Sequence, residues 1–292
     1  MADSRCDFPG HRTTIVGVLN TTPDSFSDGG RFVAARAGAA VDVEGALAVA
    51  KEFVVSGAHV LDVGGESTRP GSTGVSAQVE LARTLPVVEA LRDVVSAREI
   101  GISIDTRKSE VADAALHAGA SIVNDVSGCH HDPELPAVAA RHAATLVIGH
   151  MRGTPANMQR EPQYDDVLSE VLNELAVSVA IAERAGVARS RIVVDPGIGF
   201  GKRLEDNLAL IAGVSRLREQ LGLPVMLGAS RKSFLGTLTG EPVGDRDQAS
   251  HAACAVAAFL GVDAVRVHDV AGARRAVEVG RALGAAQQKG RT

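Results

Sequence analysis

The segment GISIDTRKSEVADAALHAGASIVND occupies residues 101–125 and holds two short aliphatic runs with a helix-period segment between them. The runs Gly101–Ile104 and Ser121–Asn124 resemble buried strands, whereas Ser109–Ala118 repeats its apolar residues with the period of a helix. Two strands joined by a helix run parallel in one sheet. The segment therefore predicts an α/β fold.

The same pattern recurs along nearly the whole chain and gives eight βα units. Because no Pro/Ser-rich linker or change of composition divides them, we predict a single-domain (β/α)8 TIM barrel with its active site at the C-terminal ends of the strands. An open, doubly wound sheet is the alternative, since periodicity does not show closure. The expected strands are Thr14–Leu19, His59–Val63, Gly101–Ile104, Ser121–Asn124, Thr145–Ile148, Arg191–Val194, Pro224–Leu227 and Val262–Val267. The expected helices are Val43–Ser56, Ser76–Val95, Ser109–Ala118, Pro133–Arg141, Asp165–Ala185, Leu204–Leu221, Asp247–Leu260 and Ala271–Leu283. Residues 1–13 are expected to form an N-terminal extension, 14–284 the barrel domain and 285–292 a flexible tail.

Composition bounds the class of protein. Of 292 residues, 45% are hydrophobic and 22% are charged, which is typical of a globular chain with a substantial core. A net charge of −5 gives no broad basic field for a nucleic acid or an anionic membrane. Three widely spaced cysteines suggest neither a disulfide framework nor a thiolate metal site. With no apolar signal segment or membrane span, we expect a cytoplasmic protein.

Polar side chains follow every expected strand, which is where a barrel places its active site. A single residue of this kind serves equally well as a turn or helix cap. Agreement at all eight strand ends favours a site. The residues are Asn20, Asp62, Asp105, Asn124 with Asp125, His150, Asp195, Lys232, and Arg266 with His268.

Two long loops follow the first two strands, at Asn20–Val41 and Gly64–Gly74. Their Gly, Ser and Pro content is typical of segments that close over a substrate, although a simple surface insertion would also have it. Arg69 lies on the second loop, where a guanidinium can bind a carboxylate or a phosphate. A solvated arginine is the alternative.

The motif DPGIGFGK at Asp195–Lys202 lacks the spacing of an ATP-binding P-loop. Its glycines let the backbone approach a ligand, and Phe200 offers a flat apolar face. We expect Asp195, with Asp105 and Asn124, to accept hydrogen bonds from the amino and ring N–H groups of a heterocycle.

Cationic residues collect after the last two strands, in Ser230–Lys232 and Arg266–Asp269. Barrels often bind phosphate in this region, although helix-start and ion-pair roles are alternatives. Asn20 supplies an oxygen of the kind that Mg²⁺ accepts when it also contacts a diphosphate.

From about Gly17 to Asp269 the chain resembles the dihydropteroate synthase family. The matching segments occur in the family's order and together are specific. They are GVLNTTPDSFSDGG at Gly17–Gly30, DVGGESTRPG at Asp62–Gly71, SIDTRKSEVA at Ser103–Ala112, IVNDVSG at Ile122–Gly128, HMRGTPANMQ at His150–Gln159, DPGIGFGK at Asp195–Lys202, GASRKSF at Gly228–Phe234 and RVHD at Arg266–Asp269.

The resemblance implies condensation of 6-hydroxymethyl-7,8-dihydropterin diphosphate with 4-aminobenzoate by a dissociative substitution, with Mg²⁺ as cofactor. It implies small-molecule substrates, no nucleic-acid or membrane partner, and a homodimer. Implied catalytic residues are Asp105, Lys232, Arg266 and His268. The implied pterin site is Asp105, Asn124, Val126, Asp195, Phe200, Gly228 and Lys232. The implied diphosphate site is Asn20, Thr68, Arg69, Arg266 and His268, with Asn20 also binding the metal. The implied 4-aminobenzoate site is Phe32, Thr68, Arg69, Pro70, Lys232 and Ser233.

One position departs from the family's pattern. Family members commonly carry methionine where this chain has Gly149, so either Met151 takes its place or the pterin pocket is wider. Two other readings compete with the synthase: a pterin-binding barrel of the corrinoid methyltransferase kind, and an inactive pterin-binding homologue. The cationic residues after the last two strands favour the synthase, because the methyltransferases bind no diphosphate.

Overall fold

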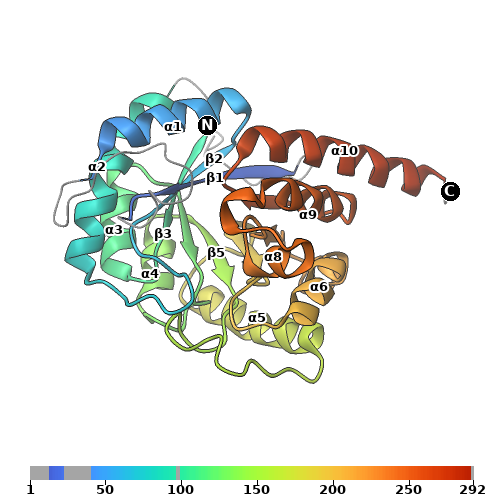
Figure 1. Ribbon diagram of the computed structural model, residues 1–292. Helices are drawn as coiled ribbons and strands as arrows, with labels where there is room; N and C mark the ends of the chain where they lie inside the picture. Colours follow the sequence, from blue (N-terminus) through green and yellow to red (C-terminus); the bar gives the residue numbers. More distant parts are fainter. Residues whose placement is uncertain (1–12, 23–40, 97–98, 291–292) are drawn as a thin grey trace.

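The computed structural model describes residues 13–22, 41–96 and 99–290. Within them, eight parallel strands form one sheet in the order β6-β5-β4-β3-β2-β1-β8-β7 (Figure 1). The strands are β1 (Thr14–Asn20), β2 (Val60–Gly64), β3 (Gly101–Asp105), β4 (Ile122–Asp125), β5 (Thr145–Gly149), β6 (Ile192–Asp195), β7 (Met226–Leu227) and β8 (Ala264–Val267).

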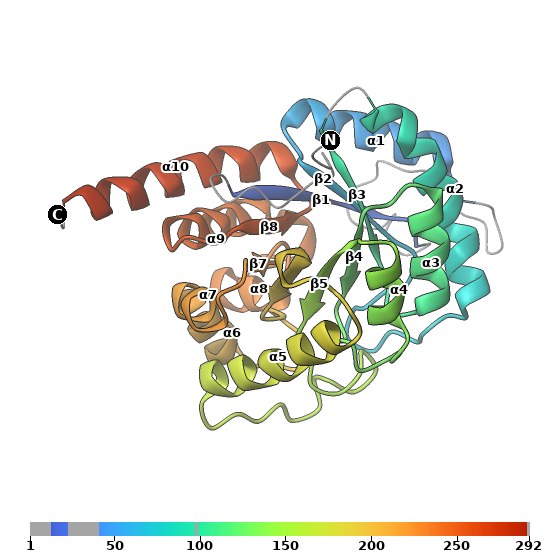
Figure 2. The same cartoon turned by 180° about the vertical axis from the view of Figure 1, so that it is seen from behind.

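The two ends of the sheet meet. Val194 in β6 forms a parallel bridge with Val225, and the Val194 amide donates to the carbonyl of Pro224 at 2.9 Å. Helices cover the outside of the closed ring (Figure 2). The predicted TIM barrel is therefore confirmed, and the open doubly wound sheet is excluded.

The alternation of side chains along the strands produces two apolar layers. One buried cluster contains a residue from seven of the strands: Val16, Val60, Ile122, Val147, Val193, Met226 and Ala264. A larger buried cluster includes Ile15, Leu61, Val123 and Leu146, the sequence neighbours of the first set, and packs with residues of the helices. The aliphatic residues of the strands thus hold the strand ends in a rigid ring.

The helices agree with the prediction except in three places. They are α1 (Val43–Ser56), α2 (Ala77–Val95), α3 (Ser109–Ala118), α4 (Leu135–Arg141), α5 (Val167–Arg184), α6 (Leu204–Ala212), α7 (Val214–Leu221), α8 (Ser233–Thr239), α9 (Asp247–Phe259) and α10 (Val270–Lys289). The helix predicted at Leu204–Leu221 divides at Gly213, because glycine is a poor helix former. Helix α8 was not predicted, because seven residues are too few to show a period.

Helix α10 continues to Lys289, past the predicted end at Leu283. Alanine, glutamine and lysine in this part are good helix formers, so residues 285–289, expected in a flexible tail, extend the helix instead. In both views this end of α10 projects beyond the barrel (Figures 1 and 2). No helix in the described part of the chain is both long and apolar enough to cross a membrane.

Candidate active site

Arg266 lies at the centre of the polar side chains inside the barrel. From β8, its Nε donates to Asp62 Oδ2 at 2.6 Å and its Nη2 donates to Asp105 Oδ2 at 2.6 Å. Asn124 in β4 donates to the same Asp62 oxygen at 3.2 Å. Four strands therefore contribute to one hydrogen-bonded group, which we call the arginine cluster: Asp62, Asp105, Asn124 and Arg266.

In the arginine cluster, burial and the neighbouring opposite charges shift the pKa values of Asp105 and Arg266 in opposite directions. Burial raises the pKa of Asp105 to about 7, and the neighbouring Asp62 carboxylate acts in the same direction, whereas Arg266 counteracts both. Burial disfavours the Arg266 cation, yet the carboxylates of Asp62 and Asp105 outweigh it and raise the pKa of that guanidinium. Arg266 is therefore a fixed cation, and Asp105 can exchange a proton near neutral pH.

The loops after β6 and β7 bring Lys232 onto Phe200. The Lys232 ammonium lies 3.8 Å from the centre of the Phe200 ring, a cation–π contact. Burial lowers the pKa of Lys232 to about 8, and the nearby cation Arg266 acts in the same direction. Gly199 has a φ of +81°, which L side chains rarely adopt, and a Cβ there would lie 3.0 Å from Lys232 Cδ, so glycine is favoured beside this lysine.

Asp195, at the end of β6, faces the same space. Its Oδ1 accepts from the Gly197 amide at 2.7 Å, and burial raises its pKa. Its other carboxylate oxygen lies 3.7 Å from the position that a Cβ would take on Gly228. Val126, which follows β4, is buried. The Phe200 ring, the Lys232 ammonium and the buried carboxylates together form a site that suits a flat heterocycle with N–H donors.

His268, just after β8, packs against the loop after β7. Its Nδ1 lies 3.0 Å from Ser230 Oγ. Burial lowers the pKa of His268 to about 3, and the neighbouring cations Arg231, Arg266 and Lys232 add to the effect. His268 is therefore neutral at physiological pH, and a bound anion would favour its protonation.

Asn20 ends β1 at the edge of the arginine cluster. A Cβ built on Gly64 would lie 3.7 Å from Asn20 Oδ1 and 3.5 Å from Asp105 Oδ2, so the two side chains flank Gly64. Ser233 is exposed at the start of α8, directly after Lys232.

The loop after β2 is held by buried ion pairs. Glu66 pairs with Arg107 and, at 2.6 Å, with Lys108, which also pairs with the fully buried Glu80. The Glu66 carboxylate accepts from the Val75 amide at 3.0 Å as well, closing the loop on itself. This network fixes the segment that contains Thr68, Arg69 and Pro70. Arg69 and Pro70 are exposed on it, and Phe32 lies outside the described residues.

Comparison with known proteins gives one consistent result. A family model described as pterin binding enzyme matches residues 16–268. A dihydropteroate synthase of Synechocystis is 44% identical over 275 residues, which are 94% of this chain and 91% of that protein. A Yersinia pestis dihydropteroate synthase in a sulfonamide drug complex is 38% identical, with a TM-score of 0.86 over 94% of this chain and 95% of that chain. A Xanthomonas albilineans dihydropteroate synthase with 4-aminobenzoic acid is 42% identical, with a TM-score of 0.82 over 94% of each chain.

This chain belongs to the dihydropteroate synthase family. Its place among these transferases agrees with the resemblance inferred from its motifs.

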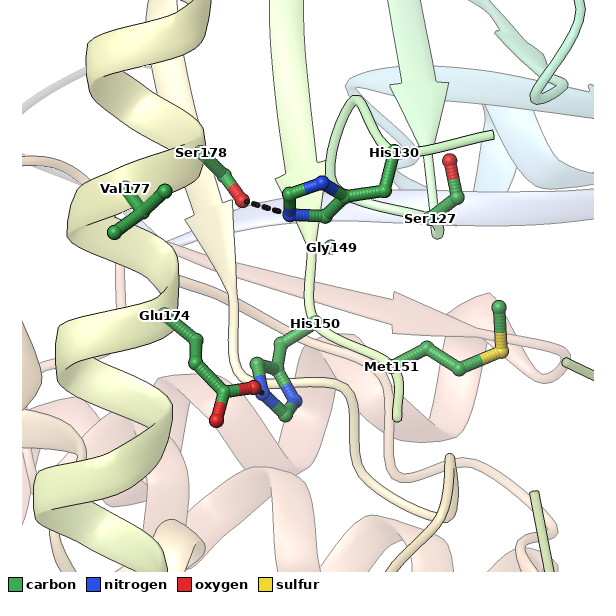
Figure 3. Close-up of a pocket in the computed structure, with 8 residues that line it drawn as sticks. All are labelled: Ser127, His130, Gly149, His150, Met151, Glu174, Val177 and Ser178. Carbon is green, nitrogen blue, oxygen red and sulfur yellow. Dashed lines mark hydrogen bonds and ion pairs between the residues drawn. The ribbon is translucent and has the colours of Figure 1, made fainter. Parts of the chain in front are cut away.

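Gly149 is the position where the chain departs from the motif common in dihydropteroate synthases. A Cβ there would lie 2.7 Å from Val126 Cα and 3.0 Å from the Asp125 carbonyl oxygen, so the backbone after β4 occupies the space that a larger side chain would need. Gly149 and Met151 both line a cavity of about 180 Å³ between the ends of β4 and β5 and helix α5 (Figure 3).

His150, in the wall of this cavity, is connected to the glycine-rich loop Asp195–Lys202. His150 Nε2 lies 2.8 Å from Glu174 Oε2, on α5 (Figure 3). On the other side of the ring, the buried Lys202 ammonium lies 3.0 Å from His150 Nδ1 and donates to the Phe200 carbonyl at 3.0 Å. Lys202 therefore ties the loop that carries Phe200 to the end of β5.

Acid should destabilise this protein partly through His150. Burial, with help from Lys202, lowers the pKa of His150 to about 4, whereas the unfolded chain binds the proton near the ordinary value of 6.5. As the pH falls from 6.5 towards 4, the unfolded state gains a proton that the folded state does not, so stability declines. In urea titrations, we expect His150→Gln to reduce the dependence of unfolding free energy on pH by up to about 1.4 kcal/mol per pH unit.

The exposed His131 supplies the matched control for that measurement. His131→Gln should keep the pH dependence of the wild type. If His150→Gln and the wild type have equal slopes between pH 6.5 and 4, the buried neutral state of His150 is refuted.

Sequence reasoning missed three groups in the site. The sequence indicates Asp62 only as a polar strand end, although it contacts both Arg266 and Asn124. It indicates Lys202 only as part of a loop motif, and nothing in that motif predicts that the side chain is buried. Glu80 lies inside α2, where helical periodicity gives no sign of a partner as distant in sequence as Lys108. The only available signal was that Asp62 begins one matching segment and Lys202 ends another.

Proposed function

We propose that this chain is an active dihydropteroate synthase, which condenses 6-hydroxymethyl-7,8-dihydropterin diphosphate with 4-aminobenzoate to give 7,8-dihydropteroate and diphosphate. The observation that carries the proposal is the arginine cluster. It holds a permanent cation and two carboxylates at the mouth of the barrel, within reach of a diphosphate and of a pterin. The pterin-binding unit would be residues 14–284.

The pterin would bind with its amino and ring N–H groups donating to Asp105, Asn124 and Asp195. Asp105 and Asp195 end β3 and β6, Asn124 is the last residue but one of β4, and its bond to Asp62 holds it in place. Lys232 would donate to the pterin carbonyl and ring nitrogen, and Gly228 leaves room beside Asp195. Val126 and Phe200 would contact the faces of the ring.

The diphosphate would lie towards Asn20, Arg266 and His268, with Thr68 and Arg69 reaching it from the loop after β2. A Mg²⁺ ion fits this end of the site, because Asn20 Oδ1 and the Asp105 carboxylate beside Gly64 are hard oxygen donors. Asp62 Oδ1 is also buried without a hydrogen-bond partner among the described residues. We propose that Asn20 binds Mg²⁺, which when bound would reduce the negative charge on the leaving diphosphate.

The 4-aminobenzoate would bind nearer the surface. Its proposed contacts are Phe32, Thr68, Arg69, Pro70, Lys232 and Ser233. The exposed position of Ser233 and of the loop fixed by Glu66 is consistent with a second substrate that enters after the pterin.

The reaction proposed is a dissociative substitution. The C–O bond to the diphosphate breaks and leaves its electron pair on oxygen, while the electron-rich dihydropterin stabilises the positive charge at its exocyclic carbon. The aryl amine then forms the C–N bond and loses a proton to water. Asp105 and Asp195 would favour the cationic pterin, and Arg266 and His268 would stabilise the departing anion.

Phe200→Ala should weaken pterin binding without unfolding the barrel. The substitution removes the face on which Lys232 rests as well as one face of the proposed pterin pocket. We expect a loss of roughly tenfold in pterin affinity by calorimetry, on the scale of one aromatic contact. Phe200→Leu, which keeps an apolar contact, should lose less. Unchanged affinity in Phe200→Ala would place the pterin elsewhere.

Diphosphate release tests the function directly. The purified protein is supplied with Mg²⁺, the pterin diphosphate and 4-aminobenzoate, beside a reaction without the amine and one with sulfamethoxazole. Release coupled to dihydropteroate formation establishes the synthase, and inhibition by the drug shows that it competes for the amine site. Pterin binding without turnover would favour the inactive homologue, and methyl transfer from methyltetrahydrofolate to a corrinoid would favour the methyltransferase.

We also propose a homodimer in the cytoplasm. Exposed apolar side chains lie on α9 and α10, at Val256, Val279 and Leu283, and they would be covered in a dimer. Light scattering measures the mass in solution. Val256→Lys should convert a dimer to a monomer if this face is the interface.

A further inference from the structure

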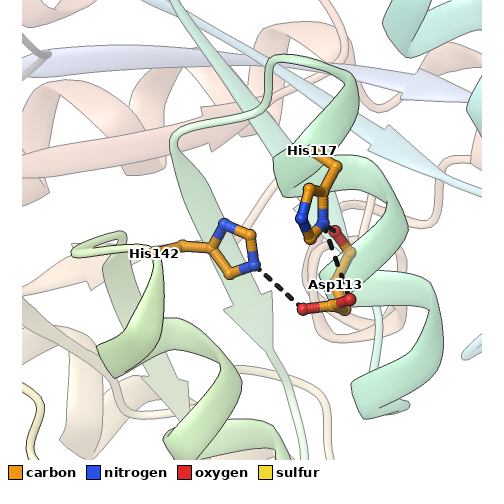
Figure 4. Close-up of side chains that lie close together, drawn as sticks. All are labelled: Asp113, His117 and His142. Carbon is orange, nitrogen blue, oxygen red and sulfur yellow. Dashed lines mark hydrogen bonds and ion pairs between the residues drawn. The ribbon is translucent and has the colours of Figure 1, made fainter.

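We propose that Asp113, His117 and His142 form a binding site for a divalent transition-metal ion of the Zn²⁺ type, separate from the reaction site. In the described part of the chain, these side chains bring two imidazoles and a carboxylate together (Figure 4). Their potential ligand atoms all lie within 4.8 Å of one another.

Two helices build the cluster. Asp113 and His117 are four residues apart on α3, so they lie one turn apart on one face. His142 follows the last residue of α4 and reaches across, with its Nε2 2.9 Å from Asp113 Oδ1. The two imidazole rings meet edge to face, with 4.5 Å between their centres. A bound ion would therefore connect α3 to the chain that enters β5.

The position of these three side chains in the barrel excludes them from the proposed reaction. Helix α3 runs back from the end of β3 to the beginning of β4, so its last turn lies at the N-terminal end of the barrel. His142 precedes β5 and lies at the same end. The arginine cluster lies at the opposite end of the strands, so the two sites can be tested independently.

Binding an ion requires one hydrogen bond to be exchanged, because His117 Nδ1 lies 2.9 Å from the Asp113 backbone carbonyl oxygen. Two ligands of a tetrahedral zinc lie about 3.4 Å apart, given metal–ligand distances of about 2.1 Å. Asp113 Oδ1 and His142 Nε2 are already closer than this, whereas His117 Nδ1 is 3.5 Å from Asp113 Oδ2. His117 is 69% exposed and can rotate, and water would complete the coordination.

The chemistry of the ligands selects the ion. Imidazole nitrogen suits Zn²⁺, Co²⁺ and Ni²⁺, whereas Mg²⁺ prefers oxygen ligands. The Asp113 carboxylate supplies an oxygen of the kind that Zn²⁺ also accepts. Arg141 competes for that carboxylate, with its Nη2 3.4 Å from Asp113 Oδ1, but it is 60% exposed and can move into solvent.

Binding of Co²⁺ and Zn²⁺ to the full-length protein tests the site. Any affinity tag is removed, metals are extracted with a chelator, and millimolar Mg²⁺ is kept present to occupy oxygen sites. Co²⁺ is followed by its visible d–d absorption and then displaced with Zn²⁺. We expect one site, and Zn²⁺ should raise the melting temperature because it binds the folded state.

Variants locate the ion. Asp113→Asn and His142→Gln should each lose at least about tenfold in metal affinity. Loss of a residue that only supports a metal ligand already costs about this much, so loss of a ligand itself should cost no less. Arg141→Ala should bind more tightly, because it removes the competing cation, and His131→Gln should bind as the wild type does. If Asp113→Asn fails to fold, the exposed His117→Gln replaces it. Absence of Co²⁺ absorption in the wild type, or equal binding by the Asp113, His117 and His142 variants, overturns the proposal.

Discussion

Asp105→Asn is expected to reduce turnover by about a hundredfold or more, which is the scale on which one preorganised electrostatic group contributes to catalysis. The amide keeps an oxygen that can accept from Arg266 but cannot carry the charge that would stabilise a cationic pterin. The fold should survive, because burial already raises the pKa of Asp105 to about 7 and its neutral form is therefore readily accommodated. Steady-state assays with both substrates measure the loss.

The pH profile distinguishes the electrostatic role from a structural one. In the wild type, kcat/KM should rise as the pH increases through about 7, because Asp105 becomes ionised in that range. Asp105→Asn should lack this rise. The exposed Asp93 provides the matched control, and Asp93→Asn should behave as the wild type. A wild-type rate in Asp105→Asn would show that Asp105 takes no part in the reaction.

Arg266→Met is expected to damage both stability and activity. It leaves Asp62, which is fully buried, and Asp105 without their cation, and breaking a buried pair from one side costs about 3–5 kcal/mol. Turnover should fall about a thousandfold, on the scale of arginines that stabilise a departing phosphate group. Denaturant titration measures the first effect, and diphosphate release measures the second.

Two companion variants separate these effects. Arg266→Lys keeps the charge but cannot form the two-pronged contact with Asp62 and Asp105, so it should recover part of the stability and little of the activity. Adding Asp62→Asn to Arg266→Met removes one of the stranded carboxylates. The double variant should be more stable than Arg266→Met alone and equally inactive. Wild-type stability in Arg266→Met would show that the buried pair contributes nothing to folding.

The strands could be predicted closely because their aliphatic runs are short and bounded by polar residues. Each observed strand begins or ends within two residues of the prediction. The largest shifts are at the starts of β7 and β8, which begin at Met226 and Ala264 and not at Pro224 and Val262. In β7 the reason is that proline has no amide hydrogen for the sheet. The division of the predicted Leu204–Leu221 helix could not be predicted, because the apolar period continues across Gly213 and does not show that the helix ends there.

It could also be predicted that the polar residues at the strand ends lie together, because parallel strands in a barrel carry their ends to one rim. Its pairings could not. Arg266 and Asp62 are 204 residues apart, and nothing local in the sequence shows that one guanidinium contacts two carboxylates. The same holds for Lys108 and Glu80, which are joined only when α2 and α3 pack together. Periodicity specifies which face of an element is buried, whereas long-range charge pairing depends on the assembled fold.

The closure of the barrel has a consequence for local unfolding. A single bridge joins β6 to the chain before β7, whereas β1 and β2 pair over five residues. Local opening should therefore begin at this seam, and amide protons beside it should exchange with solvent sooner than those of β1 and β2. Asp195 and Lys232 lie on either side of the seam, whereas Arg266, Asp62 and Asp105 lie within the continuous run of strands β3-β2-β1-β8. Local opening of the barrel would thus loosen the proposed pterin pocket first and leave Arg266, the cation proposed to contact the diphosphate, in place.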